Sequence, residues 1–241
     1  MTGEPGSRNF LAGIAADLAR LFPPRGGVSA LLTIALLLQV AYWYFGAPGS
    51  ATPRDPEHAL RSVLWAVLLL GLVPLLLIRP LGLRGEELGV SKGDVAAGRQ
   101  ALLFGLAAVI PIAWFAAGNS SFQLTYPWPG HWVGGNAIAF LSWAFTYSLY
   151  YLAYEFFYRG FLLRGLEQSL GVTAALWLQT VASTMLHLGK PLLETIAAVP
   201  AGLIFGLVAL RTRSLLYVVV IHLALGIATD LFVLLRSGGV G

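Results

Sequence analysis

The chain has 241 residues, of which 57% are hydrophobic and only 11% are charged. Soluble domains carry about 25% charged residues, so this composition excludes a soluble protein with a well-covered core and predicts a polytopic membrane protein. The net charge of +4 comes without a basic stripe interleaved with aromatics, which argues against nucleic-acid binding, and the absence of cysteine excludes disulfides, thiolate metal sites and a thiol nucleophile.

The first expected element is an amphipathic helix within residues 1–27, a segment that we expect to be cytoplasmic. Its apolar residues follow helical spacing: Phe10, Leu11, Ile14, Leu18 and Leu21. This spacing is typical of a helix lying on a membrane surface, and a disordered tail is the alternative. The acids in this stretch and the lack of a long apolar core argue against a cleaved signal peptide.

Apolar runs that are long enough to cross a bilayer begin at residue 28. A span needs about 20 residues. Seven runs are near that length: 28–47, 59–78, 101–117, 136–164, 172–188, 192–210 and 214–235. The sequence therefore predicts an all-α fold, with one membrane domain over 28–236 that is a bundle of about seven transmembrane helices. The weakest boundary is the very short connection "HLGKP" between the fifth and sixth runs.

The positive charges predict the orientation of this bundle. If the N-terminus is cytoplasmic, four of the 15 Lys and Arg residues fall outside, namely Arg54, Arg61, Lys190 and Arg236, and the other eleven fall inside. The positive-inside rule favours this arrangement. The small size and the absence of disulfides fit a bacterial inner membrane, which is the location that we expect.

Six ionisable residues fall within the predicted spans. They are Glu155 and Arg159 in the fourth run, His187 at the end of the fifth, Glu194 at the start of the sixth, and His222 and Asp230 in the seventh. Because a charge at the bilayer centre costs roughly 2.5–3.5 kcal/mol, each is expected to face the bundle interior and is a functional candidate.

Glu155 and Arg159 lie one helical turn apart, so their side chains share a face. The structural interpretation is an internal ion pair between the two residues. For Arg159 we weigh this structural interpretation equally with a functional role. For Glu155 we favour chemistry, because a buried carboxylate near histidines is a usual means of activating water.

His187 and His222 could each be an ordinary buried histidine. Together with Glu155 they place two imidazoles and a carboxylate on three helices, a set that can bind zinc and leave a position for water. Without a metal, the carboxylate can act as a general base while the imidazoles orient water or stabilise an oxyanion. The spacing does not separate a zinc site on Glu155, His187 and His222 from a metal-free mechanism.

The remaining polar residues are interpreted more simply. Glu194 follows "HLGKP" and is interpreted as an acid at a helix N-terminus, where the helix dipole favours it. Asp230 is partly rotated from the face of His222. A stripe of tyrosines at helical spacing is interpreted as helix packing: Tyr147, Tyr150, Tyr151, Tyr154 and Tyr158.

The stretches "YEFFYRG", "STMLHLGKP" and "IHLALGIATD" resemble the three motifs of the CPBP family, the CAAX-protease and bacteriocin-processing group of intramembrane proteases. This group includes the type II CAAX prenyl endopeptidases. Its motifs read E-E-x-x-x-R, F-x-x-x-H and H-x-x-x-N/D, and their order agrees over roughly residues 80–235. The resemblance implies catalytic roles for Glu155, Arg159, His187 and His222.

Three residues depart from the family pattern. Tyr154 stands where the family has its first glutamate, usually taken as the base that activates water. Ser183 replaces the phenylalanine of the second motif, and Gly226 replaces the last residue of the third. Either Glu155 has taken over as the base, with Asp230 or Glu194 supplying the missing carboxylate, or hydrolysis has been lost.

We expect an intramembrane endopeptidase that cleaves a membrane-associated peptide or protein, such as a prenylated terminus, a leader peptide or a sorting signal. Its expected partners are this substrate and the lipid bilayer, with no nucleic acid. The alternative is a catalytically inactive scaffold or immunity-type protein on the same fold. A transporter is disfavoured, because no pair of broken helices occupies corresponding halves of the chain.

Overall fold

The computed structural model describes residues 10–23, 27–47 and 54–236, and over these ranges the chain is helical without any strand. The predicted all-α fold is confirmed. The helices are α1 (Phe10–Leu21), α2 (Val28–Phe45), α3 (Pro56–Ala66), η1 (Val67–Leu72), α4 (Val73–Leu77), η2 (Gly85–Leu88), α5 (Val95–Ala117), α6 (Ser120–Thr125), η3 (Gly130–Gly134), α7 (Ala137–Glu155), η4 (Phe156–Arg164), α8 (Gly165–Met185), α9 (Leu192–Thr212) and α10 (Leu216–Arg236).

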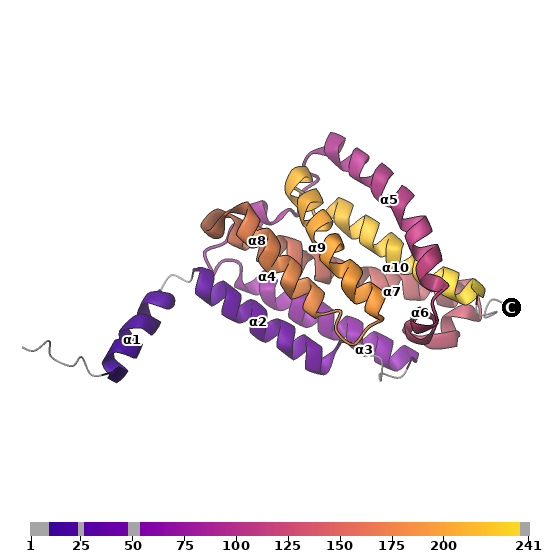
Figure 1. Cartoon of the computed structure of the whole chain (residues 1–241), viewed down its shortest axis with the longest axis horizontal. Coiled ribbons are helices and arrows are strands. Elements are labelled where there is room, and N and C mark those ends of the chain that lie inside the picture. The colour runs from indigo at the N-terminus through magenta and orange to yellow at the C-terminus, as the bar shows by residue number, and fades with distance from the viewer. Residues whose placement is uncertain (1–9, 24–26, 48–53, 237–241) are drawn as a thin grey trace, which may run out of the picture.

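The N-terminal helix α1 lies outside the bundle in Figure 1, and none of its residues is buried. The amphipathic helix predicted in this segment is therefore present. Its large apolar side chains are exposed, and the cytoplasmic location of the segment stays a prediction. The rest of that segment, residues 1–9 and 24–26, lies outside the described residues.

Among the described residues, five helical stretches are long and apolar enough to cross a membrane: Val28–Phe45, Pro56–Leu77, Val95–Ala117, Leu192–Thr212 and Leu216–Arg236. The predicted count of seven is not confirmed, because α7 with η4, and α8, are not among them. The first of these carries several tyrosines and the Glu155–Arg159 pair, and α8 is kinked at Gly171 (φ 78°).

The segment from α7 through η4 is the most enclosed part of the bundle. Eight residues of α7 and seven of the nine residues of η4 are buried by the surrounding helices. Such shielding from lipid is what allows ionisable side chains in a membrane bundle. The backbone changes from α to π geometry directly after Glu155, and π-helical turns occur frequently at functional sites.

The end of the fifth predicted span also differs from the expectation. The helix α8 ends at Met185, so His187 lies in the connection to α9 rather than inside a span. Its backbone N–H still donates to the carbonyl of Thr184, at 2.9 Å, and this turn fixes the residue beside the helix end.

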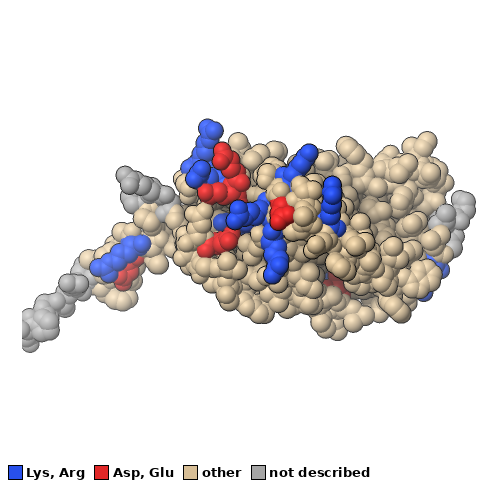
Figure 2. All heavy atoms as spheres, turned by 90° about the horizontal axis from the view of Figure 1, so that it is seen from above, with Lys and Arg blue, Asp and Glu red and all other residues tan. Residues whose placement is uncertain are grey.

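The two ends of the bundle differ in charge. Figure 2 shows charged side chains gathered toward one end, with the opposite end nearly free of them. We call the first the arginine-rich end, defined by Arg79, Arg84, Lys92, Arg99, Arg164, Arg211 and Arg213. The arginine-poor end carries Arg54, Arg61, Lys190 and Arg236.

Candidate active site

Glu155, the last residue of α7, connects two of the other predicted site residues. Its carboxylate is fully buried, with Oε2 3.2 Å from Nε of Arg159 in an ion pair, and its Oε1 accepts a hydrogen bond from Nη1 of the same arginine at 3.4 Å. Its Oε1 lies 2.5 Å from Nδ1 of His222. The structure therefore brings Glu155, Arg159 and His222 into direct contact.

Arg159 is almost fully buried, with 2% of its surface exposed. Besides Glu155, aromatic faces surround its guanidinium: the central carbon lies 5.6 Å from the ring centroid of Tyr154 and 5.7 Å from that of Phe205. Aromatic faces attract a cation at such distances, and the attraction strengthens when water is excluded. The arginine is thus held beside Glu155.

His222 has one nitrogen bound and the other open. Nδ1 donates to the carboxylate of Glu155, and no hydrogen bond within the described residues engages Nε2. The ring is packed against Tyr151, with centroids 4.6 Å apart, and against Phe205, at 5.1 Å. Its side chain keeps 15% exposure, whereas Glu155 keeps none. The nitrogen of this pair that is left open is therefore Nε2 of His222.

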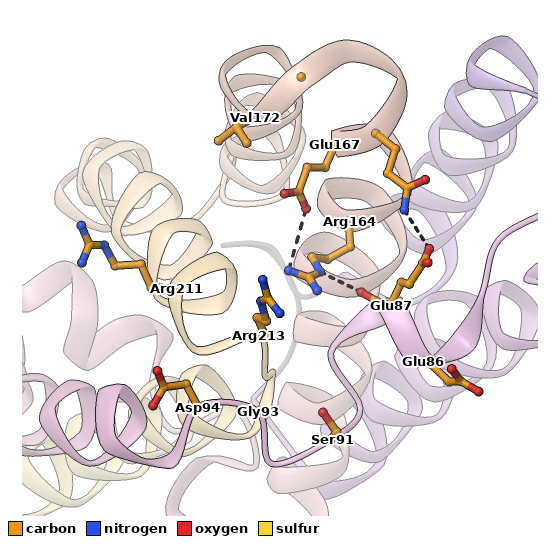
Figure 3. A pocket seen from close by; sticks show the side chains of 12 residues that line it. Glu86, Glu87, Ser91, Gly93, Asp94, Arg164, Glu167, Val172, Arg211 and Arg213 are labelled. Carbon is orange, nitrogen blue, oxygen red and sulfur yellow. Dashed lines mark hydrogen bonds and ion pairs between the residues drawn. The ribbon is translucent and has the colours of Figure 1, made fainter.

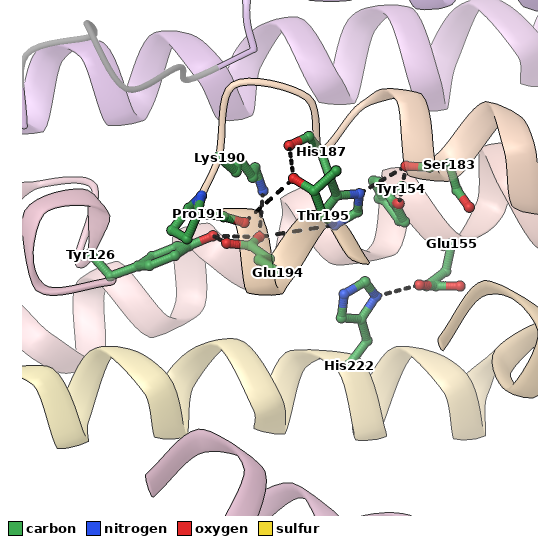
Figure 4. Close-up of polar contacts among 10 residues, drawn as sticks. All are labelled: Tyr126, Tyr154, Glu155, Ser183, His187, Lys190, Pro191, Glu194, Thr195 and His222. Carbon is green, nitrogen blue, oxygen red and sulfur yellow. Dashed lines mark hydrogen bonds and ion pairs between the residues drawn. The ribbon is translucent and has the colours of Figure 1, made fainter. Parts of the chain in front are cut away.

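His187 is anchored in the same way. Its Nδ1 lies 2.8 Å from the backbone oxygen of Ser183, which can only accept, so Nδ1 carries the proton. The carbonyl of His187 accepts from the hydroxyl of Thr195, at 2.7 Å. Its Nε2 lies 4.0 Å from Oε1 of Glu194. In Figure 4 the ring nitrogen of His222 that does not bond Glu155 points toward the side on which Glu194 lies.

Tyr154 packs edge-on against both histidines. Its ring centroid is 5.4 Å from that of His222 and 6.3 Å from that of His187, and its hydroxyl is 3.5 Å from the carbonyl of Ser183. No direct contact joins His187 to Glu155 or His222 among the described residues. At the position of the family's first glutamate, this chain therefore has an aromatic ring that packs against both imidazoles.

Glu194 has more partners than a residue that only caps a helix. The hydroxyl of Tyr126 donates to its carboxylate at 2.7 and 2.8 Å, and Nζ of Lys190 lies 3.2 Å from Oε1. Burial, and next the charge of Glu194, raise the pKa of Tyr126 well above its usual value, so the phenol stays a donor. This cluster places a third polar group beside His187.

Asp230 forms no hydrogen bond or ion pair with the other candidate site residues among the described residues. It is fully buried, and its Oδ2 accepts from the indole N–H of Trp143 at 2.8 Å. No described residue bonds its other oxygen. The bond to Trp143 joins α10 to α7.

Tyr151 is a site residue that the sequence interpretation missed. A Cβ placed on Gly226 would collide with its hydroxyl, so this hydroxyl fills the space one turn beyond His222 where the family motif has a polar side chain. The signal was present in the sequence, because Tyr151 precedes Glu155 by four residues on one helix and so shares its face.

The zinc prediction can be compared with the donors that are present. Within the described residues, no group of three or more His, Cys, Asp or Glu side chains is arranged to hold a metal ion. The carboxylate of Glu155 is engaged by Arg159 and His222, and no direct contact joins it to His187 among the described residues. This donor set does not fit a zinc centre with three protein ligands.

Chelation is therefore expected to leave any cleavage activity unchanged. Purified protein in detergent would be incubated with 1,10-phenanthroline and, separately, with its non-chelating 1,7-isomer, and initial rates of cleavage would be compared. Activity that is lost with the first reagent only, and restored by added Zn²⁺, would contradict this expectation.

The comparison with known proteins agrees with the motifs. Residues 136–228, from the start of α7 into α10, match the family model described as type II CAAX prenyl endopeptidase Rce1-like. No curated protein and no solved structure matches the chain. The predicted family resemblance is confirmed over this segment, and five described helices are long and apolar enough to cross a membrane.

Proposed function

We propose that this chain, similar to type II CAAX prenyl endopeptidases over residues 136–228, is an intramembrane endopeptidase that hydrolyses a peptide bond of a membrane-associated substrate. The single observation that carries the proposal is the bond between His222 and Glu155. A buried carboxylate on Nδ1 and an open Nε2 are the arrangement in which an imidazole serves as a general base.

The roles of the two residues follow from their exposure. Glu155 is fully buried and both its oxygens face partners, so it is poorly placed to take a proton from water itself. His222 is partly exposed and holds a free nitrogen. We therefore assign proton transfer to Nε2 of His222 and give Glu155 the task of orienting the ring and stabilising the imidazolium, with Arg159 holding Glu155 in place.

The proposed reaction begins with a water molecule whose hydrogen is accepted by Nε2 of His187. As the water oxygen adds to the carbonyl carbon of the substrate, its proton passes to Nε2 of His222. The hydroxyl of Tyr151, beside the His222 ring, is the donor that we assign to the developing oxyanion. The tetrahedral intermediate then breaks its C–N bond, and His222 returns the proton to the leaving amine, which yields an acid and an amine.

The test compares peptide termini in membranes that contain the wild-type protein with those that contain His222→Ala or His187→Ala. New termini detected by mass spectrometry are expected with the wild type. They should fall by about 10²-fold or more with His222→Ala, in the range typical of a lost general base. Termini that are equal in all three samples would sink the proposal.

An inactive scaffold or immunity-type protein is the second candidate, favoured by Tyr154 and Gly226 at two motif positions. In that case a cellular phenotype of gene deletion would be rescued fully by His222→Ala. Under the protease proposal, the same variant should fail to rescue it although it accumulates normally in the membrane.

A further inference from the structure

An apolar groove leads from the arginine-poor end of the bundle toward the candidate site. Its volume is about 360 Å³, within the range of pockets that hold small ligands. One wall is the last turn of α5 with α6, and the other is the first turns of α9. Tyr151 and Gly226 line its inner part, and Tyr151 packs on the ring of His222.

The lining of the groove suits an uncharged segment. Its one residue with a formal charge is Glu194, whose carboxylate is matched by Lys190 and by the hydroxyl of Tyr126. Figure 4 shows these three residues on one side of His187 and His222, with Glu155 on the other. The groove is also open to lipid, because Phe115 and Leu193 on its walls keep 78% and 58% of their surface exposed. An apolar chain within the bilayer can enter it without leaving the membrane.

The opposite end of the bundle has a pocket with a different lining. A polar cavity of about 1060 Å³ lies there, lined by Arg164, Arg211 and Arg213 together with acids (Figure 3). None of the candidate site residues lines it. The side chains of Glu155 and Arg159 in the candidate site are 0% and 2% exposed.

The charge difference between the ends assigns them to sides of the membrane. Seven Lys and Arg residues mark the arginine-rich end and four mark the other, and cytoplasmic ends carry the excess of positive charge. The groove therefore opens on the outer side.

We infer that the groove takes an apolar segment of a membrane-anchored polypeptide from the outer side of the membrane, and that this segment carries the scissile bond to His222. The inference rests on the proposed function and adds to it the side of entry and the substrate class. A prenylated terminus that is presented in the cytoplasm would not reach the site by this route.

The side of the opening is tested without any activity. Because the chain has no cysteine, single cysteines can be introduced: Leu188→Cys in the exposed connection at the arginine-poor end, and Ser91→Cys in the cavity of Figure 3. A membrane-impermeant maleimide added to intact spheroplasts should label Leu188→Cys at once, and Ser91→Cys only after permeabilisation. Labelling of both from one side, or the reverse pattern, would overturn the inference.

The occupant is tested by filling the groove. Ala197→Trp places a large ring among the lining residues, and Val172→Trp places the same ring in the cavity at the arginine-rich end as a matched control. Appearance of the new peptide termini should slow at least about tenfold with Ala197→Trp, since displacement of a substrate by an ångström can cost about 10²-fold, and should stay unchanged with Val172→Trp.

The outcomes separate the two proposals. Absence of cleavage by the wild type would remove the proposed function, while the labelling pattern would still report the side of the opening. Cleavage that is unaffected by Ala197→Trp would leave the proposed function standing and overturn the substrate groove. If that variant also lost a copurifying lipid, the groove would belong to an acyl chain instead.

Discussion

Replacing Glu155 by Gln is expected to reduce cleavage about 10⁴-fold, the size of the loss seen when the carboxylate behind a catalytic histidine is made neutral. The amide keeps the size of the side chain but removes the charge that fixes the proton on Nδ1 of His222. Initial rates with wild-type and variant protein, matched for the amount in the membrane, measure this effect.

The same substitution is expected to destabilise the fold by about 3–5 kcal/mol, because it leaves the guanidinium of Arg159 buried without its partner. Thermal unfolding in detergent measures this second effect. Glu155→Gln can therefore lower the cleavage rate in two ways, by impairing catalysis or by reducing the amount of folded protein, and these two causes have to be distinguished.

The double variant Glu155→Gln/Arg159→Met makes this distinction. Removing both charges of a buried ion pair is often neutral for stability, so the double variant should unfold near the temperature of the wild type. Its cleavage should stay as low as that of Glu155→Gln, because His222 still lacks a carboxylate. Recovery of activity along with stability would contradict the role of Glu155 in proton transfer.

Replacing Gly226 by Asn, the residue of the family motif, is expected to inactivate this protein rather than improve it. Its Cβ would collide with the hydroxyl of Tyr151, and overpacking of a filled site costs about 1–3 kcal/mol. The displaced Tyr151 ring packs on His222, so the active geometry should be lost as well. Unfolding temperature and cleavage rate are the two readouts.

The double variant Gly226→Asn/Tyr151→Ala tests the explanation. Truncation of Tyr151 opens the space that the new side chain needs, so the double variant should be more stable than Gly226→Asn alone. Such a coupling between two substitutions is expected for residues in contact. Additive effects on stability would show that Tyr151 and Gly226 do not share this space.

Several features could be predicted from local sequence alone. Helical spacing places Glu155 and Arg159 on one face, and their ion pair at 3.2 Å is found in the structure. Composition and apolar runs predict the all-α membrane fold, and the three motifs predict the family resemblance that the match over residues 136–228 confirms for that segment. The ion pair and the motifs depend on residues that are near neighbours in the chain, and the membrane fold depends on the average composition of the chain.

The number of spans could not be predicted in this way. Hydropathy counts apolar residues but does not tell which face meets lipid and which meets other helices. The segment from α7 through η4 is enclosed by the bundle, so its tyrosines and its ion pair are shielded without the apolar composition of a lipid-facing helix. The four-residue spacing of Gly226 from His222 likewise says nothing of Tyr151, which reaches that space from another helix.

The sequence by itself therefore determined the membrane environment, the helical fold, the family segment and the pairing of Glu155 with Arg159. Only the tertiary structure decided that His222 bonds Glu155, that His187 packs edge-on against the ring of Tyr154, and that Glu194 lies beside His187 with Tyr126 and Lys190. The physical reason is the rotation of each helix about its axis. The period of a helix fixes which of its own residues share a face, whereas packing against its neighbours fixes where that face points.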